Sequence, residues 1–340
     1  MAIETSVIIA TYKRPALLSR CLEALINQSF PCDKYEVIVV TDGVDEESEE
    51  SVTKVASQYH ECPAIRCIAL DKKRGPAAAR NAGWKNAKGE LILFTDDDCI
   101  PLFYWIESFV RVWRHFDNKE VAFSGIIKVP LPPKPTDYEK NTALLEHASF
   151  VTANCACTKK ALEKAGGLDE DFTMAWREDS ALEFDLVENN IPIVKIDGAI
   201  VVHPVRDAPW GVSIKEQKKS MFNPLLYKKH PTLYQQRIHK RPPWYYYGII
   251  FCCVTTLTAA LLHREVLMRV SLIAWITLIA WFTSKRLEGA SLTFKHVAEM
   301  IVTSFIIPFL SVYWTLYGAF HYKIFFLWHN HKPNSLKSPS

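Results

Sequence analysis

The alternation of apolar, strand-length runs with helical segments in the first two hundred residues constrains the fold more than any other feature. Five runs rich in β-branched residues fit this description: SVIIATY, YEVIVVTD, IRCIAL, ELILFTD and VAFSGII. They are apolar throughout instead of alternating with polar residues, as expected of strands buried on both faces, and helical patterns separate the first four. The pattern predicts an α/β domain with a mostly parallel, doubly wound, Rossmann-like sheet.

Polar residues gather where these predicted strands end, which is where such sheets bind ligands. They are Thr11, Tyr12 and Arg14 after the first strand, Asp42 after the second, and the triplet Asp96–Asp98 after LILFT. Mg²⁺ and Mn²⁺ commonly combine one or two carboxylates with phosphate oxygens and water. The last aspartate could equally cap the helix-like segment that follows it. The triplet alone therefore fits a metal site and a helix cap about equally well.

Two arginines lie near the same predicted edge. The segment KRGPAAARNAG contains Arg74 and Arg80 beside small residues, which allow a ligand to approach closely. Arg80 could supply positive charge to a phosphate or form a salt bridge to a nearby acid.

A proline-rich loop, KVPLPPKPTDYEK, separates this half from a second one. There we expect a strand running into a helix, a glycine turn, a helix that begins with Glu178 and Asp179, and two edge strands in IPIVKIDGAIVVHPVRD. These elements extend the same sheet, so residues 1–207 are predicted to form one domain.

The last hundred residues are almost continuously apolar. Uncharged stretches run from Trp244 to Leu262, from Val270 to Ser284 and from Met300 to Phe320, and the first and third approach the roughly 20 residues that span a bilayer. We expect a membrane region with about three helices at 244–323, followed by a polar tail at 324–340.

Charges beside these stretches predict an orientation. Basic residues precede the first stretch and lie between the second and third, so the positive-inside rule keeps the N-terminal domain in the cytoplasm and carries the C-terminus across. Residues 208–243 are rich in lysine and fit either an amphipathic element on an anionic leaflet or a solvated basic helix. We expect a multi-pass protein of the cell (inner) membrane, with membrane lipids as partners.

The overall charge argues against a nucleic-acid partner. The net charge is only +3, and charged residues make up 23% of the 340 residues. The nine cysteines show neither a disulfide framework nor metal-ligand spacing.

Taken together, these motifs resemble the family 2 glycosyltransferases, which have the GT-A fold. SVIIATYKRP is similar to that family's opening strand and turn, and EVIVVTDG to its nucleoside-binding strand, with Thr41 in place of one of two usual acids. RGPAAARNAG, LILFTDDDCIP with its DxD pattern, and TANCACTKKALEKAGGLDEDF followed by WRED complete a resemblance that covers about residues 4–204.

The resemblance implies a sugar transfer from a nucleotide-diphosphate donor, most often a UDP-sugar, to a hydroxyl of a lipid-linked or glycan acceptor. It places the donor at the residues Thr11, Tyr12, Arg14, Asp42, Arg74, Arg80, Asp96 and Asp97. A divalent cation, Mn²⁺ or Mg²⁺, would be held by Asp98 and His203, and the pair that works as DxD could be Asp96 with Asp98 or Asp97 with Asp98.

By the same resemblance, Glu178 and Asp179 occupy the catalytic position, with Asp179 as the general base. One displacement with one base implies an inverting reaction. Asn154, Trp176 and Arg177 would lie on the acceptor side.

Two alternatives stand beside this membrane-anchored, metal-dependent enzyme. A processive polysaccharide synthase is one, although such enzymes carry a QxxRW helix where this chain has EQKKSMF. A non-catalytic subunit that binds nucleotide sugars is the other, and the intact acid clusters speak against it.

Overall fold

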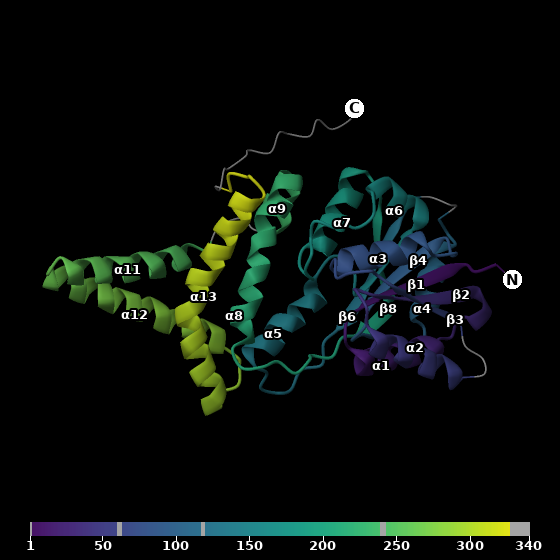
Figure 1. The fold of residues 1–340 in the computed structure, drawn as a ribbon, viewed down its shortest axis with the longest axis horizontal. Helices are drawn as coiled ribbons and strands as arrows, with labels where there is room; N and C mark the ends of the chain where they lie inside the picture. Colours follow the sequence, from purple (N-terminus) through teal and green to yellow (C-terminus); the bar gives the residue numbers. More distant parts are fainter. Residues whose placement is uncertain (1, 60–62, 117–119, 239–242, 327–340) are drawn as a thin grey trace. The chain divides into compact units, whose positions relative to one another are not determined.

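The computed structural model describes residues 2–59, 63–116, 120–238 and 243–326. The chain divides into two compact units (Figure 1). The first comprises residues 1–130 and 142–206, and the second comprises residues 131–141 and 207–340. The segment 131–141 thus belongs to the second unit although it lies within the first two hundred residues.

The first unit is built on one eight-stranded sheet with the order β3-β2-β1-β4-β7-β6-β8-β5. The strands are β1 (Thr5–Thr11), β2 (Tyr35–Thr41), β3 (Ala64–Ala69), β4 (Leu91–Asp96), β5 (Ile100–Pro101), β6 (Ala122–Lys128), β7 (Asn154–Thr158) and β8 (Ile193–Val202). Strands β1 to β4 pair in parallel, and β7 runs antiparallel to both β4 and β6. The predicted parallel, doubly wound sheet is therefore confirmed for its N-terminal half and becomes mixed beyond β4.

Helices cover both faces of this sheet (Figure 1). They are α1 (Pro15–Ile26), α2 (Glu46–Ser57), α3 (Pro76–Lys85), α4 (Trp105–Trp113), α6 (Lys159–Ala165) and α7 (Glu178–Glu188), with the 3₁₀ turns η1 (Cys32–Lys34) and η2 (Leu144–His147). Strand residues Val7 and Val37 pack in one core with α1, α2 and α4, whereas Ile8 and Ile38 pack in another with α3, α6 and α7. Alternate residues of one strand thus enter opposite cores, which explains why these strands are apolar throughout.

The expectation of two edge strands after α7 is wrong. A single strand, β8, lies inside the sheet between β6 and β5. It pairs with β6 at Ser124↔Lys195 and resumes at Ile126↔Ile200, so a bulge takes up the extra residues around Gly198. The sequence DGA has the composition of a turn, but a bulge absorbs it without reversing the chain.

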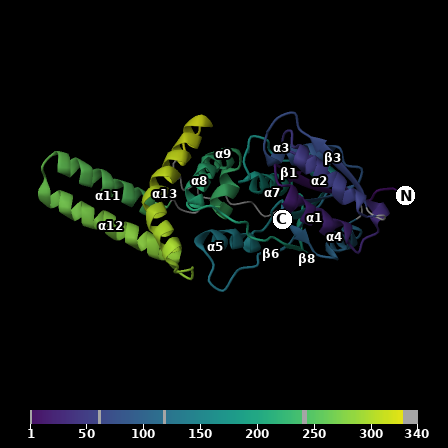
Figure 2. The same cartoon turned by 60° about the horizontal axis from the view of Figure 1, so that its bottom comes forward.

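The second unit is helical. It contains α5 (Asp137–Ala143), α8 (Val212–Glu216), η3 (Gln217–Met221), α9 (Phe222–Lys229), α10 (Pro231–Leu233), the π-helical turn η4 (Tyr234–Ile238), α11 (Trp244–Leu261), α12 (Glu265–Leu287) and α13 (Phe294–His321). Helices α11, α12 and α13 are each long and apolar enough to cross a membrane. These candidate membrane helices indicate that the protein associates with a membrane. Helices α11 and α12 form an antiparallel hairpin, and α13 crosses its direction steeply (Figure 2).

Candidate active site

The sheet brings the predicted site residues to one edge. Strand β1 pairs with β2 on one side and with β4 on the other, and Ala10 lies opposite Asp96. Because the three strands are parallel, the residues that follow them emerge at the same carboxyl edge. Thr11, Asp42 and the aspartate triplet meet there.

Asp42 holds the loop before α3. One carboxylate oxygen accepts the backbone N–H of Arg74 at 2.6 Å, and both accept the N–H of Gly75, at 2.9 and 3.0 Å. Gly75 has φ +100°, and a Cβ there would lie 2.6 Å from the Thr173 carbonyl oxygen. Only glycine fits this close approach. The loop that carries Arg74 therefore has one conformation, set by a carboxylate at the end of β2.

Asp97, the middle aspartate of the triplet, has different partners from Asp96 and Asp98. Asp97 accepts the Thr11 hydroxyl at 2.8 Å on one oxygen and the Arg14 guanidinium at 3.2 Å on the other. Burial raises the pKa of Asp97 to about 6, against the lowering effect of Arg14. Asp97 thus ties the β4 edge to the start of α1.

The last aspartate lies in a buried group of potential metal ligands. Asp98 Oδ1 is 3.6 Å from His203 Nε2, and ligand atoms of Asp98, Cys99 and His203 lie within 4.8 Å of one another. Arg206 Nε is 3.0 Å from Asp98 Oδ2. His203 Nδ1 is buried and has no hydrogen-bond partner among the described residues.

The chemistry of this group fits a hard divalent cation. A carboxylate and an imidazole suit Mn²⁺, and a carboxylate suits Mg²⁺, whereas a thiolate would favour zinc. Burial raises the pKa of Cys99 well above its usual value, so the thiol stays protonated and is a poor ligand. Asp98 and His203 are the two residues that would hold the ion.

Arg80 connects the triplet to the acids of α7. Its guanidinium, 4% exposed, lies 2.6 Å from Asp96 Oδ1 and 3.3 Å from Glu178 Oε1. Burial opposes ionisation of Asp96, but the charge of Arg80 outweighs it and lowers the pKa of this carboxyl. One buried cation therefore faces two acids that come from opposite halves of the domain.

The acids at the start of α7 have raised pKa values, in contrast to the lowered pKa of Asp96. Burial, and then the charge of Asp179, raise the pKa of Glu178 to about 7. Burial also raises the pKa of Asp179, against a 2.6 Å hydrogen bond from the Ser180 N–H. Arg177 precedes them with φ +75°, a conformation that is uncommon for a residue with a side chain. A raised pKa in a buried acid pair is typical of groups that exchange protons near neutral pH.

Three further predicted residues, Tyr12, Arg74 and Trp176, lie near the surface at the carboxyl edge of the sheet. Trp176 is 39% exposed and stacks with the Arg177 guanidinium 4.7 Å from the ring centre. Lys73 Nζ lies 3.8 Å from the centre of the Tyr12 ring, and Arg74 pairs with Glu170. These side chains are placed where a ligand could reach them.

Asn154 is placed differently. It lies within β7, is fully buried, and accepts the Trp105 indole N–H at 2.8 Å. Its amide nitrogen donates to the carbonyls of Ile126 and Ala199. The side-chain amide of Asn154 therefore makes its hydrogen bonds within the protein interior, and we do not assign this residue to the acceptor side.

Two contributors were missed from the sequence. Arg206 pairs with Asp98, and its position three residues after His203 in HPVR was the available signal. Glu170 accepts from Arg74 and from the amide of Asn81, 89 residues before it, and nothing local marks that partnership.

The mixed α/β sheet of the first unit is the fold of the GT-A class of glycosyltransferases. A mannosyltransferase of Pyrobaculum calidifontis, solved with GDP-mannose and Mn²⁺, has this fold with TM-score 0.50 and 19% identity, over 94% of this chain and 85% of that one. Residues 6–164 match the family model "Glycosyl transferase family 2". The chain therefore contains a glycosyltransferase domain of family 2.

Curated relatives have the same domain. Hyaluronan synthase of Pasteurella multocida is 28% identical over an alignment of 275 residues, covering 68% of this chain and 28% of the relative. Glycosyltransferase AglE of Haloferax volcanii is 33% identical over 102 residues, 30% of this chain and 33% of the relative. Chondroitin synthase of Escherichia coli is 25% identical over 281 residues, 68% and 39%. The chain thus spans about a third of the length of these relatives.

Proposed function

We propose that the protein transfers a sugar, with inversion, from a nucleotide-diphosphate donor to a hydroxyl of a lipid-linked or glycan acceptor beside a membrane. The observation that carries this proposal is the meeting of Asp96, Glu178 and Asp179 around Arg80, at the sheet edge that also carries the Asp98–His203 pair. The apolar helices of the second unit support a membrane-held protein, and we place the catalytic domain in the cytoplasm, where nucleotide sugars are made.

Within the triplet, Asp96 and Asp98 are the pair we assign to donor binding. Both oxygens of Asp97 bind the turn between β1 and α1, through Thr11 and Arg14, whereas Asp98 lies beside the candidate metal ligand His203. Asp98 and His203 would hold a divalent cation, which when bound supplies Lewis-acid stabilisation of the leaving diphosphate. Asp42, Arg74 and Tyr12 would line the nucleoside side, and a UDP-sugar is the donor we favour.

Asp179 is the general base of the proposal. The acceptor oxygen attacks the anomeric carbon, the bond from that carbon to the diphosphate oxygen breaks, and the hydroxyl proton passes to Asp179. Arg80 holds Asp96 and Glu178 on one cation, which keeps the donor side and the base side at a fixed separation. We assign Trp176 and Arg177 to the acceptor side of the site.

The test uses purified protein in lipid nanodiscs, a panel of nucleotide sugars and a lipid extract. We expect one donor to release its nucleoside diphosphate with Mn²⁺ and to lose this release with chelator. Asp98→Asn should abolish release, and Asp179→Asn should abolish transfer while sparing donor binding. The control Asp33→Asn changes an exposed aspartate of η1 and should leave both unchanged. Release that persists in Asp98→Asn would contradict the metal assignment.

A processive polysaccharide synthase is the second candidate, because two of the relatives are named hyaluronan synthase and chondroitin synthase. The number of sugars added to each acceptor distinguishes a single-transfer enzyme from a processive synthase. A single labelled sugar per acceptor supports the first proposal, and a ladder of products supports the second.

A further inference from the structure

Helix α13 has the length and hydropathy of a membrane span, yet it packs along the lysine-rich segment 212–229, which comprises α8, η3 and α9. Its 28 residues have a mean hydropathy of 1.6 in the most apolar window. The buried positions of α13 face two neighbours. Gly318 lies against Met221 of η3, within a contact that also involves α8 and α9, whereas Thr303 and Ile307 face the α11–α12 hairpin.

The contact between α13 and this segment runs over most of the length of the helix. Near its start, Glu299 accepts the backbone N–H of Gly211 at 2.7 Å. Further along, Lys218 Nζ lies 5.6 Å from the Trp314 ring centre. At its end, Lys228 Nζ donates to the Tyr322 carbonyl at 2.8 Å.

Close packing fixes this arrangement. A Cβ on Gly318 would collide with the Met221 carbonyl oxygen, so the α13 backbone touches η3 directly. Such an approach requires glycine, and it keeps α13 and η3 together as one layer.

The partner segment cannot lie in hydrocarbon. Residues 212–229 contain five lysines and one glutamate, and Lys215, Lys218, Lys228 and Lys229 are exposed. A charged side chain at the centre of a bilayer is costly unless it is paired or reaches water. If α13 spanned the membrane, this lysine-rich segment would have to cross beside it.

The outer face of α13 has the composition of a membrane-interface helix. Its exposed residues include Phe294, Tyr313, Leu316 and Phe320, on the side opposite the buried positions. An apolar, aromatic face on a helix whose other face packs against a lysine-rich segment suits the boundary between headgroups and acyl chains. The lysines complement the anionic headgroups of that surface.

The α11–α12 hairpin is different. The 18 residues of α11 extend about 27 Å, close to the roughly 30 Å of bilayer hydrocarbon. Polar and charged residues lie at its turn, namely His263, Arg264 and Glu265, and Arg269 lies one turn into α12. The apolar windows of α11 and α12 are 11% and 22% buried within the protein, and that of α13 is 28% buried.

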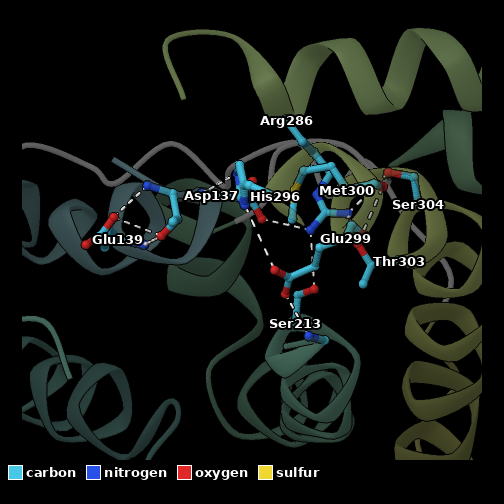
Figure 3. Close-up of polar contacts among 11 residues, drawn as sticks. Asp137, Glu139, Ser213, Arg286, His296, Glu299, Met300, Thr303 and Ser304 are labelled. Atoms are coloured by element: carbon cyan, nitrogen blue, oxygen red, sulfur yellow. Dashed lines mark hydrogen bonds and ion pairs between the residues drawn. The ribbon is translucent and has the colours of Figure 1, made fainter. Parts of the chain in front are cut away.

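A buried polar cluster fixes the base of the hairpin to the start of α13 (Figure 3). Arg286, near the end of α12, pairs with Asp137 at 2.8 Å and donates to the hydroxyls of Thr303 and Ser304. His296 accepts the Asp137 N–H at 3.2 Å. Because α13 crosses the hairpin direction steeply, a hairpin that enters the bilayer leaves α13 along its surface (Figures 1 and 2).

We propose that α11 and α12 cross the membrane as a hairpin, whereas α13 lies on an anionic bilayer surface together with the lysine-rich segment 212–229. The N- and C-termini then lie on the same side of the membrane. This differs from the three crossings expected from hydropathy, and it does not depend on the proposed sugar transfer.

Reporter fusions to the full chain test the number of crossings. Green fluorescent protein and alkaline phosphatase are joined in turn to Met1 and to Ser340 and expressed in a bacterium with a periplasm. We expect both termini to give the same reporter pattern. A control with one established transmembrane helix inserted before the C-terminal reporter must reverse that end. Opposite patterns at the two unmodified termini would overturn the proposal.

Photo-crosslinking tests what covers the outer face of α13. Benzoylphenylalanine replaces Leu316 or Phe320 on that face, and Met300 on the buried face serves as the control. We expect lipid adducts at the outer positions in vesicles containing anionic lipid, and only internal crosslinks at Met300. Crosslinked dimers, or adducts to another protein in native membranes, would show that a protein covers this face instead and would refute the lipid assignment.

Discussion

Replacing Glu178 with glutamine should stabilise the protein at alkaline pH. Burial and the neighbouring Asp179 raise the pKa of Glu178 to about 7, from 4.5 for a free glutamate. The native state therefore binds more protons than the unfolded state between those values, and stability falls as the pH rises through that window. The interval from 4.5 to about 7 corresponds to about 3 kcal/mol.

The expected profile follows from that sign. Glu178→Gln should be nearly neutral at pH 4, where the native carboxyl is protonated and similar in shape to the amide. The stabilisation should grow through pH 6 and reach its full value, on the order of 3 kcal/mol, above pH 7. Urea or thermal unfolding of the detergent-solubilised protein, followed at several pH values, measures it.

The control is Glu120→Gln, which removes an exposed glutamate that pairs with the exposed Lys164. An exposed pair of this kind contributes about 0–1 kcal/mol, so its profile should stay close to the parent at every pH. If Glu178→Gln destabilises the protein at pH 8 by more than about 1 kcal/mol, then the ion pair with Arg80 outweighs burial and the reasoning is wrong.

Three further predictions concern the triplet, the base and the membrane unit. Asp97→Asn should keep donor turnover within about tenfold of the parent because Asp97 only connects β4 to α1, whereas Asp96→Asn should lower turnover more than about a hundredfold. Steady-state kinetics measure both, and equal losses would count against the assignment of Asp96 and Asp98 to donor binding. Turnover should rise with pH on its acidic limb, with an apparent pKa above that of a free aspartate, because the base Asp179 must be ionised and burial raises its pKa; a flat profile from pH 5 to 8 would argue against this base. Arg286→Met should destabilise the second unit by about 3–5 kcal/mol because Asp137 is left buried without its cation, while Lys285→Met, at an exposed neighbour, should change the melting temperature little.

Local pattern was sufficient for the elements of the catalytic domain. Hydrophobic periodicity depends on neighbouring residues, and it predicted β1 to β4 and helices α1 to α3 almost to their ends. The same reasoning failed at β8, since a bulge and a turn have similar compositions. Whether the chain reverses or continues there depends on pairing with β6, which is distant in the sequence.

The candidate site was predicted as a set of residues but not as a network. Asp96 and Asp98 were candidates because they follow a predicted strand, whereas the roles of Asp179 and His203 were implied by the family resemblance. Arg80 joins Asp96 to Glu178, which lies 98 positions after Arg80, and this depends on which faces α3 and α7 present to the sheet. The partners of Asp97 likewise lie 86 and 83 positions earlier.

By itself, the sequence determined the kind of protein: an α/β domain with acids at its strand ends, followed by helices apolar enough for a membrane. These properties follow from composition and from contacts between near neighbours. The tertiary structure decided which aspartate is engaged by the fold, which acids share the buried arginine, and which lysines lie along α13. Those outcomes require residues far apart in the chain to meet, and the free energy that brings them together comes from packing the whole sheet and its helices.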